Sequence, residues 1–289
     1  MFLNLVIISL LLSKRLLPNK DYRYDKSSSN EPTMPKAIKA ILFDMDGTLL
    51  DTEALSDKAV LLAFGRTLDP KILQKPPMSD FRLPWELKKR ILGLRGTDWI
   101  PIVKEYAVQH WQVKEESFPS IDKFQKSWEE SLNLMCSEIE ACKGATKLVE
   151  ELAKAKLPMV IATSSRYAAV EKKRQRHEAI FKHMQEIVAG DDPAVRSGKP
   201  APDIYLEAAR RLNVDPRDCL VFEDALSGVQ SGKAAGCMTV AIPDERFSEK
   251  EKTAFRDQGD VVLGTLLDFD GTEFGVAVNM AAYHCLETA

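Results

Sequence analysis

The sequence lacks the features of secreted, disulfide-bonded proteins. Its 289 residues include five cysteines, and no two of them have the CxxC spacing of a redox or zinc motif. The odd number argues against a disulfide framework, so we expect free thiols in a reducing compartment. No N-x-S/T glycosylation acceptor is present either. These absences favour a cytoplasmic protein.

The sequence also lacks a strong charge of either sign and the common nucleotide-binding loops. A formal net charge of -3 predicts no general attraction to nucleic acid or to an anionic membrane. No G-x-G-x-x-G follows a predicted strand. The P-loop-like segment Gly228–Lys233 is one residue too short and is followed by Ala234 instead of Ser or Thr. We therefore expect a small-molecule partner, no nucleic acid, and local groups that hold any anionic ligand.

No apolar run is long enough for an ordinary membrane-spanning helix, which needs ~20 residues. The N-terminal run Phe2–Leu12 has the length of a signal-peptide core, but no positive residue precedes it and no A-x-A cleavage site follows it. Two interpretations stay open. Residues 1–35 contain an organelle or secretory targeting segment, or they are a dispensable leader and flexible linker with Met34 as the functional start. We expect no membrane partner for the folded part, and a monomer.

Short apolar runs recur along the rest of the chain without polar alternation. Such runs are typical of strands that are buried on both faces. Between them, residues 145–156 and 202–212 carry apolar side chains three and four positions apart, which indicates helices. This order predicts an α/β fold with a doubly wound, Rossmann-like parallel sheet. The runs are residues 37–46, 157–164, 219–224 and 238–243, with a weaker one at 186–190.

Residues 51–142 break this pattern because they contain no convincing strand. Proline and glycine divide them into several helical stretches. We therefore expect an inserted all-helical cap lobe at 51–142, and a catalytic core formed by residues 36–50 and 143–289. The helical stretches are roughly residues 53–64, 85–92, 97–110 and 121–138.

Polar residues stand where the predicted strands end. Because ligands bind at the carboxyl ends of strands in open parallel sheets, we expect these side chains to converge on one small volume. They are Asp44 and Asp46 after the first run, Thr163 and Ser164 after the second, Lys199 in the loop after the weak run, and Glu223 and Asp224 after the third.

Four carboxylates in one volume cannot all stay ionised unless something compensates their charge. A hard divalent cation does so, and Mg²⁺ prefers carboxylates, water and phosphate oxygens. Lys199 and the two hydroxyl residues are then available for a tetrahedral anion. Taken singly, a D-x-D pair is usually a turn, Thr163 is a helix cap and Glu223–Asp224 is a helix-start acid pair. Their common position after buried strands favours a site.

Four segments of the chain resemble the haloacid dehalogenase superfamily, and within it the small-molecule phosphatases with a helical cap. The likeness is greatest to the pseudouridine-5'-phosphatase group and extends over residues 36–270. The segments are FDMDGTLLDTE, ATSS, GKPAPDIY and VFEDALSGVQSGKAAG.

The resemblance implies a role for each candidate residue. Asp44 would be the nucleophile that forms an aspartyl phosphate, and Asp46 the general acid and base. Asp44, Asp224 and the backbone carbonyl of Asp46 would hold Mg²⁺, with Glu223 in support. The phosphoryl group would be held by Thr163, the Ser164 backbone and Lys199.

Two departures separate this chain from the related beta-phosphoglucomutases. Those enzymes carry a histidine twelve residues after the nucleophile, where this chain has Ser56. They also carry a cap arginine for the second phosphate, and Arg95 here is displaced by one position. Both points favour a phosphatase for a nucleotide or sugar phosphate, with pseudouridine 5'-phosphate as one candidate. The alternatives are a phosphosugar mutase and a non-catalytic binding protein of the same fold.

Two further segments are expected to lie outside the site. A second DFDGT at residues 268–272 is not followed by the other motifs, so we interpret it as a decoy. The basic segment KKRQRH at residues 172–177 is expected to be a solvated helix face.

Overall fold

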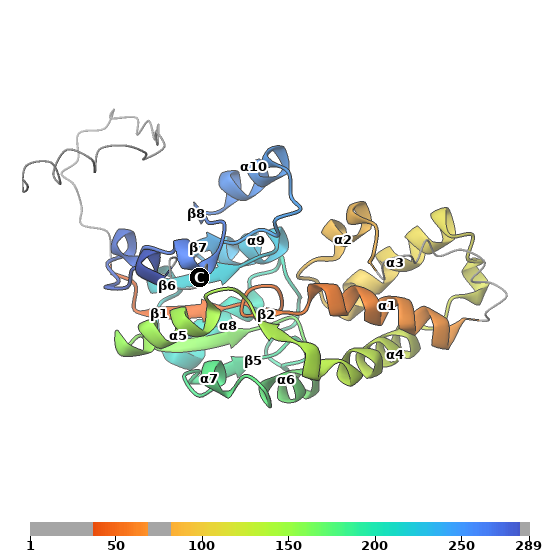
Figure 1. The fold of residues 1–289 in the computed structure, drawn as a ribbon, viewed down its shortest axis with the longest axis horizontal. Coiled ribbons are helices and arrows are strands. Elements are labelled where there is room, and N and C mark those ends of the chain that lie inside the picture. The colour runs from red at the N-terminus through yellow and green to blue at the C-terminus, as the bar shows by residue number, and fades with distance from the viewer. Residues whose placement is uncertain (1–36, 69–81, 284–289) are drawn as a thin grey trace, which may run out of the picture. The chain divides into compact units, whose positions relative to one another are not determined.

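The computed structural model describes residues 37–68 and 82–283. A six-stranded parallel sheet runs through it in the order β5-β4-β1-β6-β7-β8, with helices packed beside it (Figure 1). The chain builds outwards from β1 to β5 and then returns to the other side of β1, so the predicted doubly wound α/β fold is confirmed. The strands are β1 Ala40–Phe43, β4 Met159–Ala162, β5 Glu186–Val188, β6 Cys219–Glu223, β7 Met238–Ala241 and β8 Val261–Val262.

The central strand β1 is buried on both faces. Ile41 and Phe43 pack with helix α5 (Ala145–Lys154) in one apolar cluster. Leu42 points the other way and packs with helix α8 (Asp203–Leu212) in a second cluster. Because both faces are covered by helices, the strand is apolar at every position and shows no alternation.

Four more helices complete this part of the structure. They are α6 Tyr167–Arg174, α7 Glu178–Phe181, α9 Leu226–Ala234 and α10 Glu249–Gln258. The sequence prediction missed α10 and β8. A mostly polar sequence hides α10, although Ser248 and Glu251 form a capping box at its start. Strand β8 is too short for a periodic signal.

A group of four helices, which we call the helical lobe, has an aromatic core of its own. Phe64 contacts the rings of Trp111, Phe118 and Phe124 at centroid distances of 5.4, 5.7 and 4.8 Å. Helix α1 packs along α4, which brings the first and last helices of the lobe together. The helices are α1 Glu53–Thr67, α2 Trp85–Ile91, α3 Gly96–His110 and α4 Ile121–Leu134.

The expectation of a strand-free insertion is wrong at its two ends. Strand β2 (Leu50–Asp51) pairs antiparallel with β3 (Glu140–Ala141). Two residues are too few to give a pattern in the sequence, and the pair forms because the segments entering and leaving the helical lobe run side by side. The domain boundaries at residues 36–50, 51–142 and 143–289 stay a prediction.

The second DFDGT runs from the end of one short 3-10 helix, Leu266–Asp268, into the start of another, Gly271–Phe274. Asp268 accepts a hydrogen bond from the Thr265 N–H at 2.8 Å, and Asp270 accepts one from the Thr272 N–H at 3.0 Å. Both acids therefore cap local turns.

Among residues 37–68 and 82–283, no helix is both long and apolar enough to cross a membrane. The run Phe2–Leu12 lies outside the described residues, so both interpretations of the leader stay open. The four cysteines in the described part are free, and Cys285 lies outside it. The monomeric state and the cytoplasmic location also stay predictions.

Candidate active site

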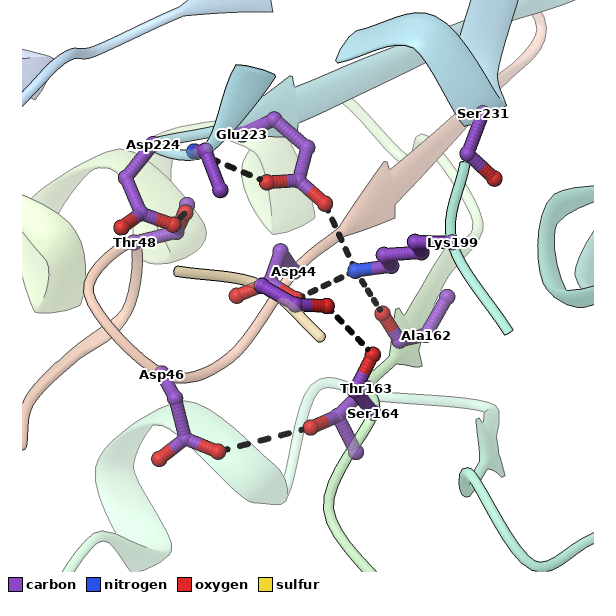
Figure 2. Close-up of polar contacts among 12 residues, drawn as sticks. Asp44, Asp46, Thr48, Ala162, Thr163, Ser164, Lys199, Glu223, Asp224 and Ser231 are labelled. Atoms are coloured by element: carbon purple, nitrogen blue, oxygen red, sulfur yellow. Dashed lines mark hydrogen bonds and ion pairs between the residues drawn. The ribbon is translucent and has the colours of Figure 1, made fainter. Parts of the chain in front are cut away.

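Asp44 and Lys199 form the centre of the site. Asp44 directly follows β1, and its N–H donates to the Phe222 carbonyl at 3.0 Å, which extends the strand pairing by one residue. The fully buried Lys199 ammonium donates to Asp44 Oδ1 at 2.5 Å, Glu223 Oε1 at 2.6 Å and the Ala162 carbonyl at 3.2 Å (Figure 2). One cation thus joins the ends of β1, β4 and β6.

Glu223 has no exposed surface and is held from three sides. Besides Lys199, it accepts hydrogen bonds from the Tyr205 hydroxyl at 2.7 Å and the Ala225 N–H at 3.2 Å. Gly228 on α9 makes room for it, because a Cβ at this position would lie 1.7 Å from Glu223 Oε1. These contacts orient Glu223 toward Lys199, which suits its predicted supporting role.

Asp44, Glu223 and Asp224 could together hold a metal ion. Each offers a carboxylate oxygen, and the three oxygens lie within 4.8 Å of one another. Burial raises the pKa of Asp224 well above its usual value, and the charges of Asp44 and Glu223 raise it further. Burial also raises the pKa of Asp44, although the neighbouring Lys199 opposes this shift. Lys199 contacts Asp44 and Glu223 of these three buried acids, and a divalent cation would supply the missing positive charge.

Lys199 itself stays protonated. Burial alone lowers the pKa of its ammonium, but the charges of Asp44 and Glu223 outweigh burial and raise it above its ordinary value. The lysine is therefore a fixed positive charge beside the oxygen of Asp44.

The turn after β1 brings the backbone close to Asp224. Gly47 has a φ of 91°, which L side chains rarely adopt, and a Cβ there would lie 2.2 Å from Asp224 Oδ2. The next residue, Thr48, donates from its hydroxyl to Asp224 Oδ1 at 3.2 Å. Gly47 and Thr48 thus help to position Asp224 in the cluster of three buried acids.

Asp46 is held by a different set of partners. Its carboxylate points toward the segment after β4, apart from Lys199 (Figure 2). Oδ2 accepts from the Ser165 hydroxyl at 2.7 Å and from the Thr163 hydroxyl at 3.5 Å, and Oδ1 accepts from Lys173 Nζ at 2.5 Å. Burial raises the pKa of Asp46, but Lys173 and the neighbouring hydroxyls outweigh burial and lower it.

Lys173 is a residue that the sequence interpretation missed. It lies in KKRQRH, which was expected to be a solvated helix face, and that expectation is wrong at this position. Helix α6 ends at Arg174 and turns Lys173 inward with 3% of its surface exposed, whereas Lys172 is exposed. The fully buried Val170 lies three residues earlier on the same helix face, and this spacing was the available signal.

The two hydroxyl residues after β4 have different partners. Thr163 is almost fully buried, and its hydroxyl accepts the Ser165 N–H at 3.1 Å. The Ser164 hydroxyl donates to the Gly93 carbonyl, between α2 and α3, at 2.8 Å. A second such bond runs from the Ser227 hydroxyl to the Leu92 carbonyl at 3.0 Å. The Ser164 side chain therefore contacts the helical lobe.

A cavity next to Asp44 and Asp46 is lined by residues of both the sheet edge and the helical lobe. Its space between atoms is about 930 Å³, counting the part open to solvent. Trp99 and Trp128 form an edge-to-face pair in its wall, with ring centroids 5.2 Å apart. Lining residues at the sheet edge include Asp44, Asp46, Thr163, Ser164, Ser165 and Lys173, and those of the lobe include Leu132, Gln125, Glu129 and Asn133.

Lys88 is a second buried lysine that the sequence did not indicate. It ion-pairs with Glu53 at 2.5 Å and with Asp57 at 2.7 Å, which ties α2 to α1. Both Lys88 and Glu53 line the cavity. This network supports the wall of the helical lobe next to Asp44.

A model of the haloacid dehalogenase-like hydrolase family matches residues 38–236. The chain belongs to this family. It is 34% identical to (DL)-glycerol-3-phosphatase 1, mitochondrial, of Arabidopsis thaliana, over 83% of this chain and 74% of that protein. It is also 34% identical to a probable pseudouridine-5'-phosphatase of Drosophila melanogaster, over 83% of this chain and 95% of that protein. The family resemblance of the four sequence segments is therefore confirmed.

Solved structures support the same family. The crystal structure of CbbY from Rhodobacter sphaeroides in complex with phosphate matches with a TM-score of 0.62 and 26% identity, over 79% of this chain and 94% of that chain. The individual roles of Asp44, Asp46, Thr163, Ser164, Lys199, Glu223 and Asp224 stay predictions.

Arg95 and Ser56 are the two positions at which the sequence departs from the mutase pattern. Arg95 donates from Nη2 to the Val195 carbonyl at 3.3 Å, and it is not among the described residues that line the cavity. Ser56 does line the cavity, and its carbonyl accepts the Trp128 indole N–H at 3.4 Å.

Proposed function

We propose that the protein is a Mg²⁺-dependent phosphatase that hydrolyses a small phosphorylated metabolite through an aspartyl phosphate on Asp44. The observation that carries this proposal is the separation of two acids at one strand end. Asp44 lies against Lys199 and the acidic cluster, and Asp46 lies against hydroxyls and a second lysine. Both face the same cavity. This arrangement suits a nucleophile and a separate proton donor.

The reaction proceeds in two displacements. Asp44 attacks phosphorus, and the bond from phosphorus to the leaving oxygen breaks while Asp46 protonates that oxygen. Asp46 then takes a proton from water, whose oxygen attacks the aspartyl phosphate. Inorganic phosphate leaves and Asp44 is restored. Lys199 offsets negative charge near Asp44, and Thr163 with the Ser164 backbone holds phosphoryl oxygens.

Mg²⁺ bound by Asp44, Asp224 and the Asp46 carbonyl would neutralise phosphoryl charge. The lowered pKa of Asp46 suits its role as a base toward water. To act first as an acid it must take up a proton as substrate binds, and the negative phosphate favours this because it opposes the effect of Lys173.

The cavity favours a monophosphate with an amphipathic leaving group. The aromatic pair Trp99 and Trp128 offers an apolar wall, and Gln125, Glu129 and Asn133 offer hydrogen-bonding edges. A nucleotide or sugar phosphate has both characters. Relatives named for pseudouridine-5'-phosphate, glycerol-3-phosphate and phosphorylated carbohydrates support this class, and pseudouridine 5'-phosphate is one candidate. The engagement of Arg95 with the Val195 carbonyl favours hydrolysis over a bisphosphate-dependent mutase.

The proposal is tested by measuring phosphate release from a panel of phosphomonoesters with Mg²⁺ and with EDTA. We expect turnover with Mg²⁺, none with EDTA, and recovery when Mg²⁺ is restored. Asp44→Asn should abolish release while circular dichroism stays unchanged, because an amide is a poor nucleophile. Wild-type turnover in this variant would exclude the mechanism. A product that keeps its phosphate would indicate a mutase instead.

A further inference from the structure

Lys173 is a buried cation whose only part in the proposed mechanism is its effect on the pKa of Asp46. An ammonium group loses its hydration when it is buried, so it persists in such a place when opposite charge and hydrogen-bond acceptors replace the water. Lys173 has 3% exposed surface and has both: Asp46 Oδ1 at 2.5 Å and the Ser165 hydroxyl oxygen at 3.1 Å. Its partner Asp46 is the proposed general acid, and the orientation of this carboxylate decides whether it can pass a proton to the leaving oxygen.

Lys173, Ser165 and Asp46 form a closed triangle. The Ser165 hydroxyl accepts from Lys173 and donates to Asp46 Oδ2 at 2.7 Å. Asp46 Oδ1 therefore accepts from helix α6, and Oδ2 accepts from the segment after β4, where Ser165 gives the shorter bond and Thr163 a longer one. A carboxylate held at both oxygens cannot rotate freely about its last bond. Asp46 is part of a turn and its side chain is 24% exposed, so the turn alone would leave that rotation open.

The two acids at the end of β1 thus have separate lysines. Lys199 contacts Asp44 and Glu223, whereas Lys173 contacts Asp46 and Ser165. We propose that Lys173 is a positioning residue that, together with Ser165, holds the Asp46 carboxylate in the direction needed to protonate the leaving oxygen. This inference rests on the proposed phosphatase function.

A comparison of two leaving groups tests the role of Lys173. Lys173→Met keeps the length of the side chain and removes its charge. Lys172→Met, on the exposed side of the same helix, is the matched control. The substrates are phenyl phosphate, whose leaving group needs protonation more, and p-nitrophenyl phosphate, whose leaving group needs it less. Both have the same ring, so binding in the cavity is closely matched.

We expect Lys173→Met to lower kcat/KM for phenyl phosphate about tenfold more than for p-nitrophenyl phosphate, because general acid catalysis contributes on the order of 10²–10⁴ in rate. Lys172→Met should leave both values near wild type. An equal loss on both substrates would assign Lys173 to phosphate binding or to the fold, and would overturn the proposal. Wild-type values in Lys173→Met would overturn it as well.

Ser165→Ala keeps the test decisive should Lys173→Met fail to fold. This change removes the shorter of the two hydroxyl hydrogen bonds to Asp46 Oδ2 and leaves the lysine in place. We expect the same selective loss of kcat/KM for phenyl phosphate, with a smaller ratio between the two substrates. If Ser165→Ala affects both substrates equally, the proposal is overturned. Asp44→Asn distinguishes a failure of the proposed phosphatase function from a failure of the positioning role of Lys173. If that variant keeps turnover, the proposed function fails. If it is inactive and the Lys173 and Ser165 variants show no selectivity, the positioning role alone fails.

Discussion

Asp224→Asn is the change that best tests whether the acidic cluster is a cation site. The substitution removes one of three buried carboxylates but keeps an oxygen that can accept the hydrogen bond of the Thr48 hydroxyl. Burial and the neighbouring acids raise the pKa of Asp224, so its ionised form destabilises the metal-free protein. The variant should therefore be more stable than wild type without Mg²⁺ and should gain nothing when Mg²⁺ is added.

The magnitude follows from the cost of burying a polar group without full compensation. We expect the free energy of unfolding without metal to rise by roughly 1–3 kcal/mol at pH 7. This corresponds to about 2–8 °C in Tm. Mg²⁺ at 100 times its Kd should stabilise wild type by about 2.7 kcal/mol. With Mg²⁺ present, the wild-type protein should therefore be about as stable as Asp224→Asn, or more stable.

The pH dependence has a definite sign. An acid with a raised pKa in the folded state costs stability once the pH is high enough for the unfolded chain to ionise, and the cost disappears where both states carry the proton. The advantage of Asp224→Asn should therefore be small near pH 4, about the ordinary pKa of Asp, should grow as the pH rises toward the folded-state pKa, and should level off above it.

Thermal unfolding with EDTA and with Mg²⁺ measures these differences. Glu273→Gln is the control, because it removes one carboxylate at an exposed position. It should respond to Mg²⁺ as wild type does. The reasoning is refuted if Asp224→Asn is less stable than wild type in EDTA and is still stabilised by Mg²⁺.

The other predictions concern the site and its support. Asp46→Asn should lower kcat by on the order of 10²–10⁴ and let the phosphorylated enzyme accumulate with p-nitrophenyl phosphate, measured by rapid quench; an unchanged kcat would exclude its role. Gly228→Ala should destabilise the fold by about 1–3 kcal/mol in urea unfolding, because its Cβ would overlap Glu223. Gly65→Ala, with open space around it, should not lower stability, and equal effects at both glycines would contradict this reasoning. Lys88→Met should cost about 3–5 kcal/mol, since it leaves the buried Asp57 and the partly exposed Glu53 without their cation; a loss below 1 kcal/mol would argue against that network.

Much of the sheet and of the site could be predicted because both depend on a local pattern. A strand covered on both faces is a continuous apolar run, and Asp44 comes directly after such a run. In a parallel sheet, the ends of neighbouring strands meet, so residues as distant in sequence as Asp44, Lys199 and Asp224 could be expected together. The structure places a shared cluster at that edge.

The roles of individual polar side chains around the site were harder to predict. Ser165 and Ser164 are adjacent serines, yet one contacts Asp46 and the other contacts the helical lobe. Nothing in the sequence distinguishes them, because the direction of each hydroxyl depends on the path of the turn after β4.

The sequence by itself determined the order of the main strands and helices and the set of acids at the sheet edge, since apolar runs and the residues that end them are local properties. Tertiary structure alone decided which lysines are buried. Lys173 and Lys88 are ordinary basic residues in their segments, and each is buried because its helix is rotated toward an acid on another element. That rotation depends on how whole helices pack, and a lysine can meet a distant acid only after the chain has folded.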